Sequence, residues 1–445
     1  MSFMRAFWKQ ISTFQVILLG FLAVILLGSL LLMLPVSASA GTVTSFPNAL
    51  FTATSAVCVT GLIVQDTATY WSEFGQAVIL LLIQIGGLGV ISAASAISLL
   101  AGRRIRLRQR STIQEAISAP QVGGVVRFTR FILKFTFCAE LLGALCMLPV
   151  FAKDFGLGKG IWYAVFHAVS AFCNAGFDLM GVREPYSSLT SFVGEPLINL
   201  PIMLLILSGG LGFYTWNDIF THRFRFSRYH MQSKIILVMT AVLVVLPAAY
   251  FFFAEFSAWQ PAQRIFASLF QAITPRTAGF NTASFSAMKD GSIAVLIVLM
   301  LIGGAPGSTA GGLKTTTAAV LVSSAVSVFR RNKETHFFGR RIPEDTIAKA
   351  SALLLLYLAL FLTGGVSISL AEGLPLQDCL FETASAVATV GLTVGITPTL
   401  GLFSKIVLIL LMFFGRVGGL TFLYAAVFPK QENFSKLPLE KINIG

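Results

Sequence analysis

Charged side chains are scarce in this sequence of 445 residues. Only 11% of the residues are Asp, Glu, Lys or Arg, whereas 56% are hydrophobic and the mean hydropathy is +0.81. Soluble domains carry about 25% charged and about 45–50% apolar residues. The composition therefore excludes a soluble protein and predicts a chain that lies in a lipid bilayer.

Acidic residues, cysteine and histidine are also few. The chain has 19 Asp and Glu against 32 Lys and Arg, which gives a net charge of +13. The basic residues form clusters beside apolar runs, as in the cytoplasmic loops of membrane proteins, so no nucleic-acid partner is predicted. The five cysteines all lie in apolar or repeated segments and imply neither a disulfide framework nor a metal site. No cofactor is predicted in this chain.

One sequence element occurs four times, each time between two long apolar segments. The copies occupy residues 51–62, 166–177, 270–280 and 381–392. In the first, second and fourth copies, Phe lies ten residues before a glycine and Ser lies six before it. The third copy is one residue shorter and has Thr274 and Pro275 instead. The aligned glycines are Gly61, Gly176, Gly279 and Gly391.

Each copy is part of a larger unit that consists of a span, a half-length helix, the glycine loop and a second span. The predicted units are residues 1–115, 116–230, 231–342 and 343–445. Their expected spans are 14–34 and 76–100, 131–150 and 195–214, 235–253 and 292–329, and 347–370 and 403–428, with short helices starting near residues 46, 161, 262 and 376. The predicted fold is therefore an all-α integral membrane protein with eight transmembrane helices and four re-entrant pore loops around a pseudo-fourfold pore.

The first span and the basic residues predict the orientation. Residues 37–40 resemble a signal-peptidase site, but the apolar run before them exceeds a usual signal peptide, and the repeat needs this helix as its first member. The segments between units are rich in Arg and Lys, as at 103–110, whereas the segments within units hold few. Both termini are therefore predicted in the cytoplasm and the glycine loops towards the outside.

The four glycine loops are the candidate cation site. A single glycine in a span is usually a packing device, but an irregular loop after a half-length helix needs protein or a water-filled path around its carbonyls. Four loops around one axis can replace the hydration shell of a cation with backbone carbonyls, and glycine permits the required φ without a Cβ. The predicted filter residues are Val59, Thr60, Gly61, Asn174, Ala175, Gly176, Thr277, Ala278, Gly279, Thr389, Val390 and Gly391.

A second set of glycines lies in the latter span of each unit, and two copies of it are unusual. The third copy continues as a glycine-rich run with one proline, Pro306, and cannot stay one helix. The fourth has Arg416, whose charge must face the bundle interior and find partners. Arg416 either caps carbonyls of a neighbouring helix or sets an electrostatic barrier that holds the third loop across the path. The predicted gate residues are Ala305, Pro306, Gly307, Ser308, Thr309, Ala310, Gly311, Gly312 and Arg416.

The same run is similar to two enzyme motifs, and neither fits. Gly307, Gly312 and Lys314 imitate a nucleotide-binding P-loop, but Leu313 is inserted and no strand precedes the run. The segment ending at Ser308 is similar to an intramembrane serine protease, yet the Gly-x-Ser-Gly pattern is absent and all four histidines lie outside the spans. No enzymatic activity is predicted.

Together, the four units, their glycine loops, the break in the third unit and Arg416 resemble the Trk/Ktr/HKT superfamily over nearly the whole chain. Length and short termini are most similar to the membrane subunit of the bacterial Ktr potassium uptake system. The resemblance implies channel-like K⁺ uptake in the bacterial plasma membrane, and it leaves Na⁺ dependence open. It also implies a homodimer on a cytosolic ring of nucleotide-binding (ATP/ADP) regulatory subunits of the KtrA type. In relatives that pass mainly sodium the first filter glycine is often serine, so Gly61 favours potassium.

The chief alternative is a secondary cation transporter that works by alternating access. Discontinuous helices fit both mechanisms. Such carriers have repeats related by inversion or by halves, whereas four copies in one orientation point to a central axis. A receptor or scaffold that transports nothing would explain neither the filter glycines nor Arg416.

Overall fold

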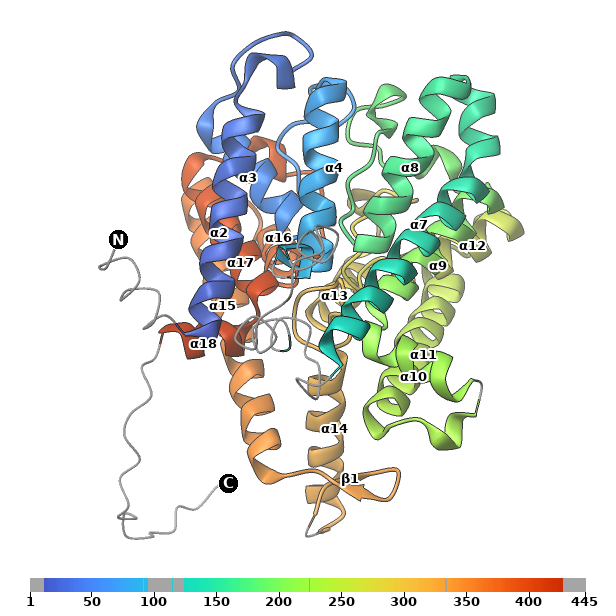
Figure 1. Ribbon diagram of the computed structural model, residues 1–445, viewed down its shortest axis with the longest axis vertical. Helices are drawn as coiled ribbons and strands as arrows, with labels where there is room; N and C mark the ends of the chain where they lie inside the picture. The colour runs from blue at the N-terminus through green and yellow to red at the C-terminus, as the bar shows by residue number, and fades with distance from the viewer. Residues whose placement is uncertain are drawn as a thin grey trace.

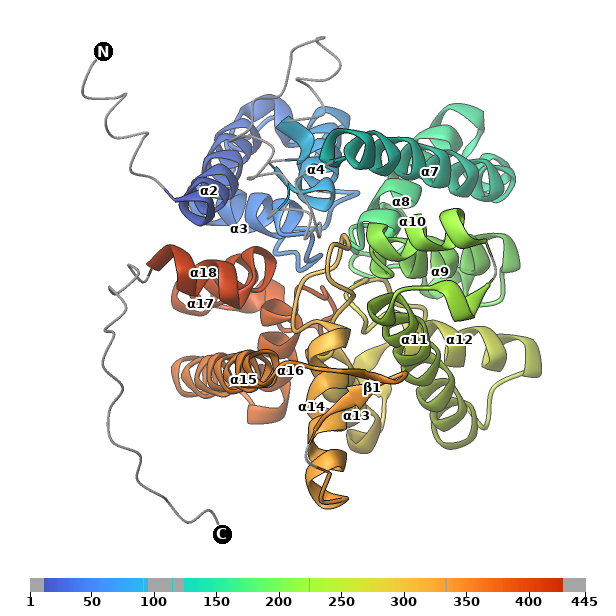
Figure 2. The same ribbon diagram turned by 60° about the horizontal axis from the view of Figure 1, so that its bottom comes forward.

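The computed structural model describes residues 12–90, 92–94, 114, 124–223, 225–332 and 334–426. Within these ranges the protein is helical except for its loops and one short hairpin, in which β1 (His336–Phe337) pairs antiparallel with β2 (Arg340–Arg341). The helices follow one another around a central region in chain order, as the change of colour in Figure 2 shows. The predicted all-α class is confirmed.

Four long helices agree with the predicted first spans (Figure 1). Each is long and apolar enough to cross a bilayer, for which about 20 residues are needed. Their outward faces carry exposed apolar side chains, such as Leu27 at 62% and Leu246 at 65% of full exposure, which suit contact with lipid. These helices are α2 (Thr13–Leu32), α7 (Val125–Phe155), α11 (Met231–Tyr250, extended by the π-helical turn Phe251–Glu255) and α15 (Glu344–Glu372).

A short helix follows each long one, close to the predicted positions. With 12 to 17 residues, these helices are too short to cross a bilayer. Pro261 opens α12 and Pro375 precedes α16, which are favourable places because the first N–H groups of a helix have no intrahelical partner. The short helices are α3 (Phe46–Val57), α8 (Leu157–Cys173), α12 (Pro261–Ile273) and α16 (Leu376–Val387).

The helix that comes next is shorter than the predicted second span in every case. Three of the four end within two residues of a glycine whose φ lies between 82° and 89°. A left-handed residue cannot continue a right-handed helix, so the helix stops there. The glycines are Gly89, Gly212 and Gly418. The helices are α4 (Glu73–Leu88), α9 (Pro196–Gly210), α13 (Asp290–Leu301) and α17 (Leu402–Val417).

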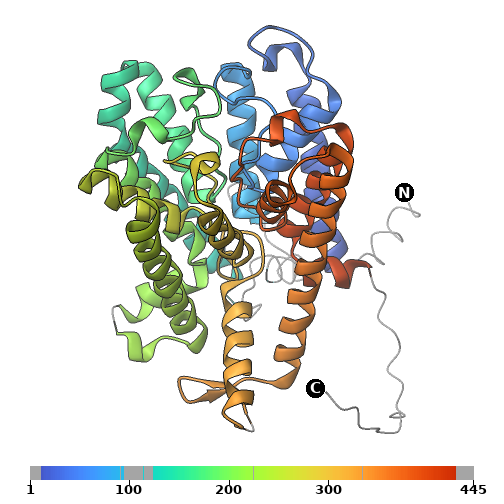
Figure 3. The same ribbon diagram turned by 180° about the vertical axis from the view of Figure 1, so that it is seen from behind.

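Beyond three of these breaks a further helix is described. Helix α10 (Phe213–His222) is bent by 96° from α9, α14 (Thr315–Phe329) follows the irregular segment 302–314, and α18 (Gly419–Ala426) follows α17. Figure 3 shows α14, the hairpin and the start of α15 reaching beyond the other helices at one end. Among the described residues four unbroken helices can span a bilayer, or five if α9 and α10 form one span. The predicted interruption of the second span in the third unit is thus present, and the second helices of the other units also end before the predicted end of their span.

The phenylalanine that begins each copy of the repeat belongs to the core. All four rings are fully buried, with 0% of their surface exposed. Burying such a side chain contributes roughly 1.5–3 kcal/mol relative to leaving it in water. The repeated ring therefore fixes each short helix inside the bundle. The four residues are Phe51, Phe166, Phe270 and Phe381.

We expect Gly160→Ala to destabilise the protein and Gly158→Ala to leave it as stable or more stable. Both glycines lie in α8, but a Cβ on Gly160 would come within 2.7 Å of the Ala152 backbone in α7, whereas no described atom lies within 4 Å at Gly158. The first change forces the helices apart at a cost of about 1–3 kcal/mol. The second removes a glycine from a helix, worth up to about 1 kcal/mol. The Tm of purified protein measures both, and an unchanged Tm for Gly160→Ala would contradict this packing.

Candidate ion-conduction site

The four glycine loops meet at the centre of the molecule. At each aligned glycine, an added Cβ would lie between 2.0 and 2.6 Å from a backbone atom of the next loop in the ring. Real Cβ contacts are never so short, so only glycine fits. The last loop returns to the first, which closes the ring. The approaches are Gly61 to Ala175, Gly176 to Gly279, Gly279 to Val390, and Gly391 to Thr60.

Two residues of each loop have a left-handed backbone. The aligned glycines have φ between 70° and 93°, where an L side chain is penalised and glycine is not. The residue two positions earlier is never glycine, yet its φ lies between 54° and 68°. Such strain persists only where the surroundings impose it, and it is concentrated at functional sites. The four strained residues are Val59, Asn174, Thr277 and Thr389.

The hydroxyl of the repeated Ser or Thr braces each loop from within. In the first and fourth copies the Ser oxygen accepts the N–H of the aligned glycine at 3.0 Å. In the second copy Ser170 donates to the carbonyl of Phe177 at 2.7 Å. In the third copy Thr274 donates to the carbonyl of Phe280. The repeated hydroxyl therefore holds the shape of the loop, a role that the sequence pattern did not reveal.

The second set of glycines allows helices to pack against the short helices. One glycine of each set in α4, α9 and α17 would place a Cβ 2.0–2.1 Å from a carbonyl oxygen in the last two residues of the preceding short helix. Small residues that permit such close backbone approach are typical of helix packing in membranes. The contacts are Gly86 with Val57, Gly209 with Phe172, and Gly415 with Val387.

A buried carboxylate, Glu382 of α16, holds the segment that follows the fourth loop. Its side chain is 0% exposed and accepts the hydroxyl protons of Thr393 and Thr397, the latter at 2.6 Å. It also accepts the N–H of Val394 at 3.2 Å. Sequence reasoning missed this residue, although an acidic side chain in a buried short helix was the signal that could have identified it.

Asp66 plays a similar part after the first loop. Its side chain is 7% exposed and accepts two N–H groups of its own loop, from Ala68 at 3.0 Å and Thr69 at 2.9 Å. Its second oxygen accepts the N–H of Tyr186 at 3.0 Å. Because Tyr186 follows the second loop, Asp66 ties two neighbouring segments of the ring together.

The predicted gate loop, residues 305–312, is irregular and bonded to its neighbours. The N–H groups of Ala305 and Thr309 donate to the last two carbonyls of α9, at 2.9 and 3.2 Å. The hydroxyl of Thr309 donates to the carbonyl of Phe172 at 3.1 Å. The N–H of Gly312 donates to a carbonyl of α17 at 3.3 Å. The loop therefore contacts the second and fourth copies as well as its own.

Arg416 reaches this loop. Its guanidinium donates to the carbonyl of Thr309 and, on the other side, to the carbonyls of Gly86 and Gly87 in α4. No carboxylate forms an ion pair with it in the described part of the chain. Its charge is thus balanced by carbonyl dipoles alone, and it remains able to repel a cation nearby.

A cavity of about 270 Å³ adjoins Arg416 and the loop. Lys314 also lines it and donates to the carbonyl of Ala310 at 2.8 Å. Two basic side chains therefore line one cavity next to the loop 305–312. The position of the Lys314 side chain in this cavity was not predicted from the sequence.

The sequence matches a family model described as TrkH, cation transport protein, over residues 9–436. The chain belongs to the TrkH family. The predicted resemblance is thereby confirmed. Ktr system potassium uptake protein B of Bacillus subtilis is 39% identical over 434 residues, which cover 96% of this chain and 95% of that protein. Potassium/sodium uptake protein NtpJ of Enterococcus hirae is 37% identical, with 98% of each chain covered.

A solved member of the TrkH family has the same fold. The crystal structure of the potassium transporter TrkH from Vibrio parahaemolyticus matches with a TM-score of 0.70 at 19% identity. The match covers 91% of this chain and 84% of that chain. In the present TrkH-family protein all predicted filter residues are buried and lie in the four loops that meet.

We expect Gly391→Ala to reduce cation flux through this TrkH-family protein and Gly373→Ala to leave it unchanged. Both glycines are left-handed, with φ of 91° and 69°, so both changes carry the same kind of backbone cost. A Cβ on Gly391 would lie 2.0 Å from the carbonyl oxygen of Thr60, whereas no described atom lies within 4 Å at Gly373. Overpacking of this kind corresponds to a loss of cation flux of about tenfold or more. Flux into proteoliposomes measures both, and equal flux would show that the ring is not the path.

Proposed function

We propose that this protein takes up potassium across the bacterial plasma membrane through the ring of four loops. The closed ring of buried backbone carries the proposal, since every loop approaches its neighbour at a left-handed glycine. Carbonyl oxygens in such a ring can replace the water around a cation. The relatives named for potassium uptake and potassium/sodium uptake, at 39% and 37% identity, support K⁺ as the permeant ion and keep Na⁺ as a second one.

The four short helices support a cation at this point. Each ends where its glycine loop begins, so the partial negative charge of its C-terminal end lies next to the ring. The last residues of these helices are Val57, Cys173, Ile273 and Val387. Four such ends add to the attraction of the loop carbonyls without a fixed acidic side chain in the ring.

The gate in this proposal is the loop 305–312 together with Arg416. Arg416 bonds to Thr309 on one side and to α4 on the other, which pins the loop between elements of different copies. Its charge raises the energy of a cation below the ring, and Lys314 adds a second charge at the same cavity. The channel opens when movement of α14, which begins just after the loop, pulls the loop away.

We propose that the protein consists of the four units predicted from the sequence, residues 1–115, 116–230, 231–342 and 343–445. In each, a long helix and a short helix precede the glycine loop, and a second helix follows it. The excess of Arg and Lys between units supports an orientation with both termini in the cytoplasm and the loops towards the outside.

The proposal includes partner subunits. The phrase "Ktr system" in the name of the Bacillus relative indicates more than one component. We infer a homodimer that assembles with a cytosolic ring of nucleotide-binding subunits of the KtrA type. Helix α14 and the hairpin, which extend beyond the other helices, are the parts of this chain that such a ring would reach first (Figure 3).

Ion flux into proteoliposomes of the purified protein tests this function. We expect a K⁺ gradient to drive flux without a second substrate, and K⁺ to pass faster than Na⁺. Gly61→Ser should weaken this preference, because its Cβ would lie 2.5 Å from the carbonyl oxygen of Ala175. If flux requires a substrate on both sides of the proteoliposome membrane, alternating access is favoured instead. If the protein is folded but passes no cation, the proposal is contradicted.

We expect Arg416→Gln to raise K⁺ flux in the absence of any partner subunit. The change removes the charge and the bonds that pin the loop, each hydrogen bond to a charged group being worth about 1.5–3 kcal/mol, so flux should rise roughly tenfold. Lys405→Gln is the control, since it removes the same charge from the same helix at a residue that contacts Asn48 instead. A folded Arg416→Gln variant no leakier than the control would place the gate elsewhere.

A further inference from the structure

A second cavity, of about 450 Å³, lies away from the ring. It is formed between the connection that joins α10 to α11 and the β1–β2 hairpin. Three of its lining side chains, Arg228, Lys234 and Arg340, are cations, and no Asp or Glu belongs to the lining that the described residues provide. The cavity therefore has the charge of an anion site.

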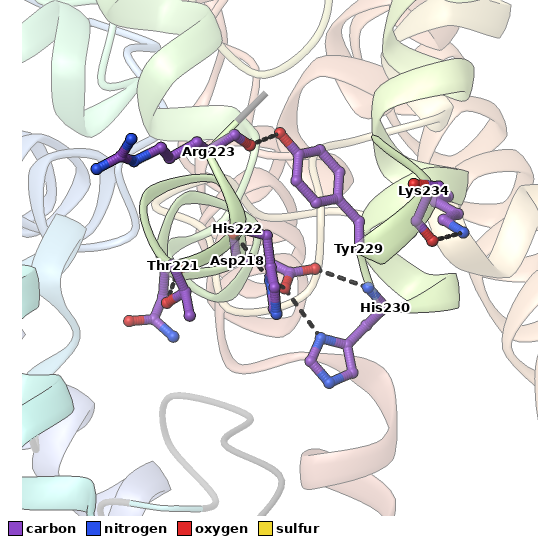
Figure 4. A network of polar contacts seen from close by, with 9 residues as sticks. Asp218, Thr221, His222, Arg223, Tyr229, His230 and Lys234 are labelled. Carbon is purple, nitrogen blue, oxygen red and sulfur yellow. Dashed lines mark hydrogen bonds and ion pairs between the residues drawn. The ribbon is translucent and has the colours of Figure 1, made fainter. Parts of the chain in front are cut away.

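Asp218 of α10 fixes one wall of this cavity (Figure 4). Its side chain is 2% exposed, and its Oδ1 lies 2.8 Å from Nδ1 of His222 and 3.0 Å from Nδ1 of His230. Its Oδ2 accepts the N–H of His230 at 2.8 Å. These bonds join the last turn of α10 to the residue before α11. They also occupy the carboxylate, so it is not available to pair with the cations of the cavity.

Aromatic rings hold the hairpin against this wall. The ring of Phe338, at the hairpin turn, lies 6.2 Å from that of Phe226. The ammonium group of Lys234 lies 5.8 and 5.7 Å from these two rings and donates to the carbonyl of Ser227 at 2.9 Å. The hairpin thereby brings Arg340 to the same cavity as Arg228.

Two of the cations have no partner. Within the described residues, the guanidinium groups of Arg228 and Arg340 make no hydrogen bond, ion pair or ring contact. Guanidinium is the preferred donor to phosphate because its N–H groups match two phosphate oxygens at once. Helix α11 also begins at this cavity, since its first residue, Met231, belongs to the lining.

We propose that this cavity binds a phosphate-bearing anion, with Arg228, Arg340 and Lys234 as its ligands. The phosphate belongs either to the headgroup of an acidic phospholipid or to a soluble phosphate compound. The cavity lies at the end of α11, a helix apolar enough to cross the bilayer, so a headgroup is within reach. It is also open to exposed residues of the hairpin, so a soluble compound can reach it.

Both walls of the cavity lead to the loop 305–312. At the other end of α10, the N–H of Phe213 donates to the carbonyl of Gly307 at 3.0 Å. On the other side, α14 begins after the loop and leads to the hairpin. An anion that joins the two walls therefore restrains both segments that extend from the loop. This effect on gating rests on the proposed function, whereas the binding itself does not.

Binding to the purified full-length protein tests the site. Titration calorimetry in neutral detergent uses inorganic pyrophosphate as the soluble probe, with chloride added to match ionic strength. The Tm in vesicles of phosphatidylcholine, with and without phosphatidylglycerol, reports the lipid. The variant is Arg228→Gln with Arg340→Gln. The control is Arg330→Gln with Arg331→Gln, which removes the same charge at the end of α14 outside the cavity.

We expect pyrophosphate to bind the parent and the control equally and the cavity variant about tenfold or more weakly. A rise in Tm with phosphatidylglycerol that the cavity variant alone lacks would also support the site, and would identify a lipid headgroup as the source. If the double variant does not elute as folded protein, the single change Arg340→Gln on the exposed hairpin replaces it.

Two outcomes would overturn the proposal. The first is that cavity variant and control respond alike to both probes. The second is that hexaglutamate binds in a cavity-dependent manner while pyrophosphate and phosphatidylglycerol have no effect, which would assign the cavity to carboxylates. Neither measurement needs ion flux, so failure of this site and failure of the proposed function are distinguishable.

Discussion

The approach of four backbone loops to within contact distance at the centre of the molecule is the constraint on which the structure depends. In a bilayer every backbone carbonyl that is not in a helix needs protein or water beside it. The ring meets this need only because its contact points are glycines, and because the helices behind it pack just as closely through Gly86, Gly209 and Gly415. The buried phenylalanines and the Ser or Thr hydroxyls then keep each loop in one conformation.

Charged side chains lie around the ring of four loops rather than in it. No carboxylate lies in the ring itself, and the buried acids Glu382 and Asp66 instead hold the segments that follow it. On the other side, Arg416 and Lys314 donate to carbonyls beside the first cavity. In the proposed function, the attraction of the ring for a cation therefore comes from dipoles, which are weaker than full charges and would allow an ion to leave as well as to bind.

Much of the fold could be predicted because its signals are local. Apolar runs located the long helices, and the repeat located the short ones, so α3 at Phe46–Val57 nearly matches the helix expected to start at residue 46. The breaks at Gly89 and Gly418 were not predicted, because glycine within an apolar run can equally remain helical. The left-handed φ at these two glycines is seen only in the assembled structure. The bracing role of Glu382 was missed for the same reason, since its partners lie 11 to 15 residues away along the chain.

Arg416 bonds to a loop of the third copy and to a helix of the first, although it belongs to the fourth. If the ring were built from four identical subunits, each subunit would carry such an arginine and such a loop. The four loops would then collide, and the four arginines would repel one another at the same height along the axis. Because the four copies are joined in one chain, each can diverge alone. A change acquired in one copy then acts once rather than four times. A single asymmetric contact, such as that of Arg416 with the loop 305–312, can therefore form beside a nearly symmetric ring.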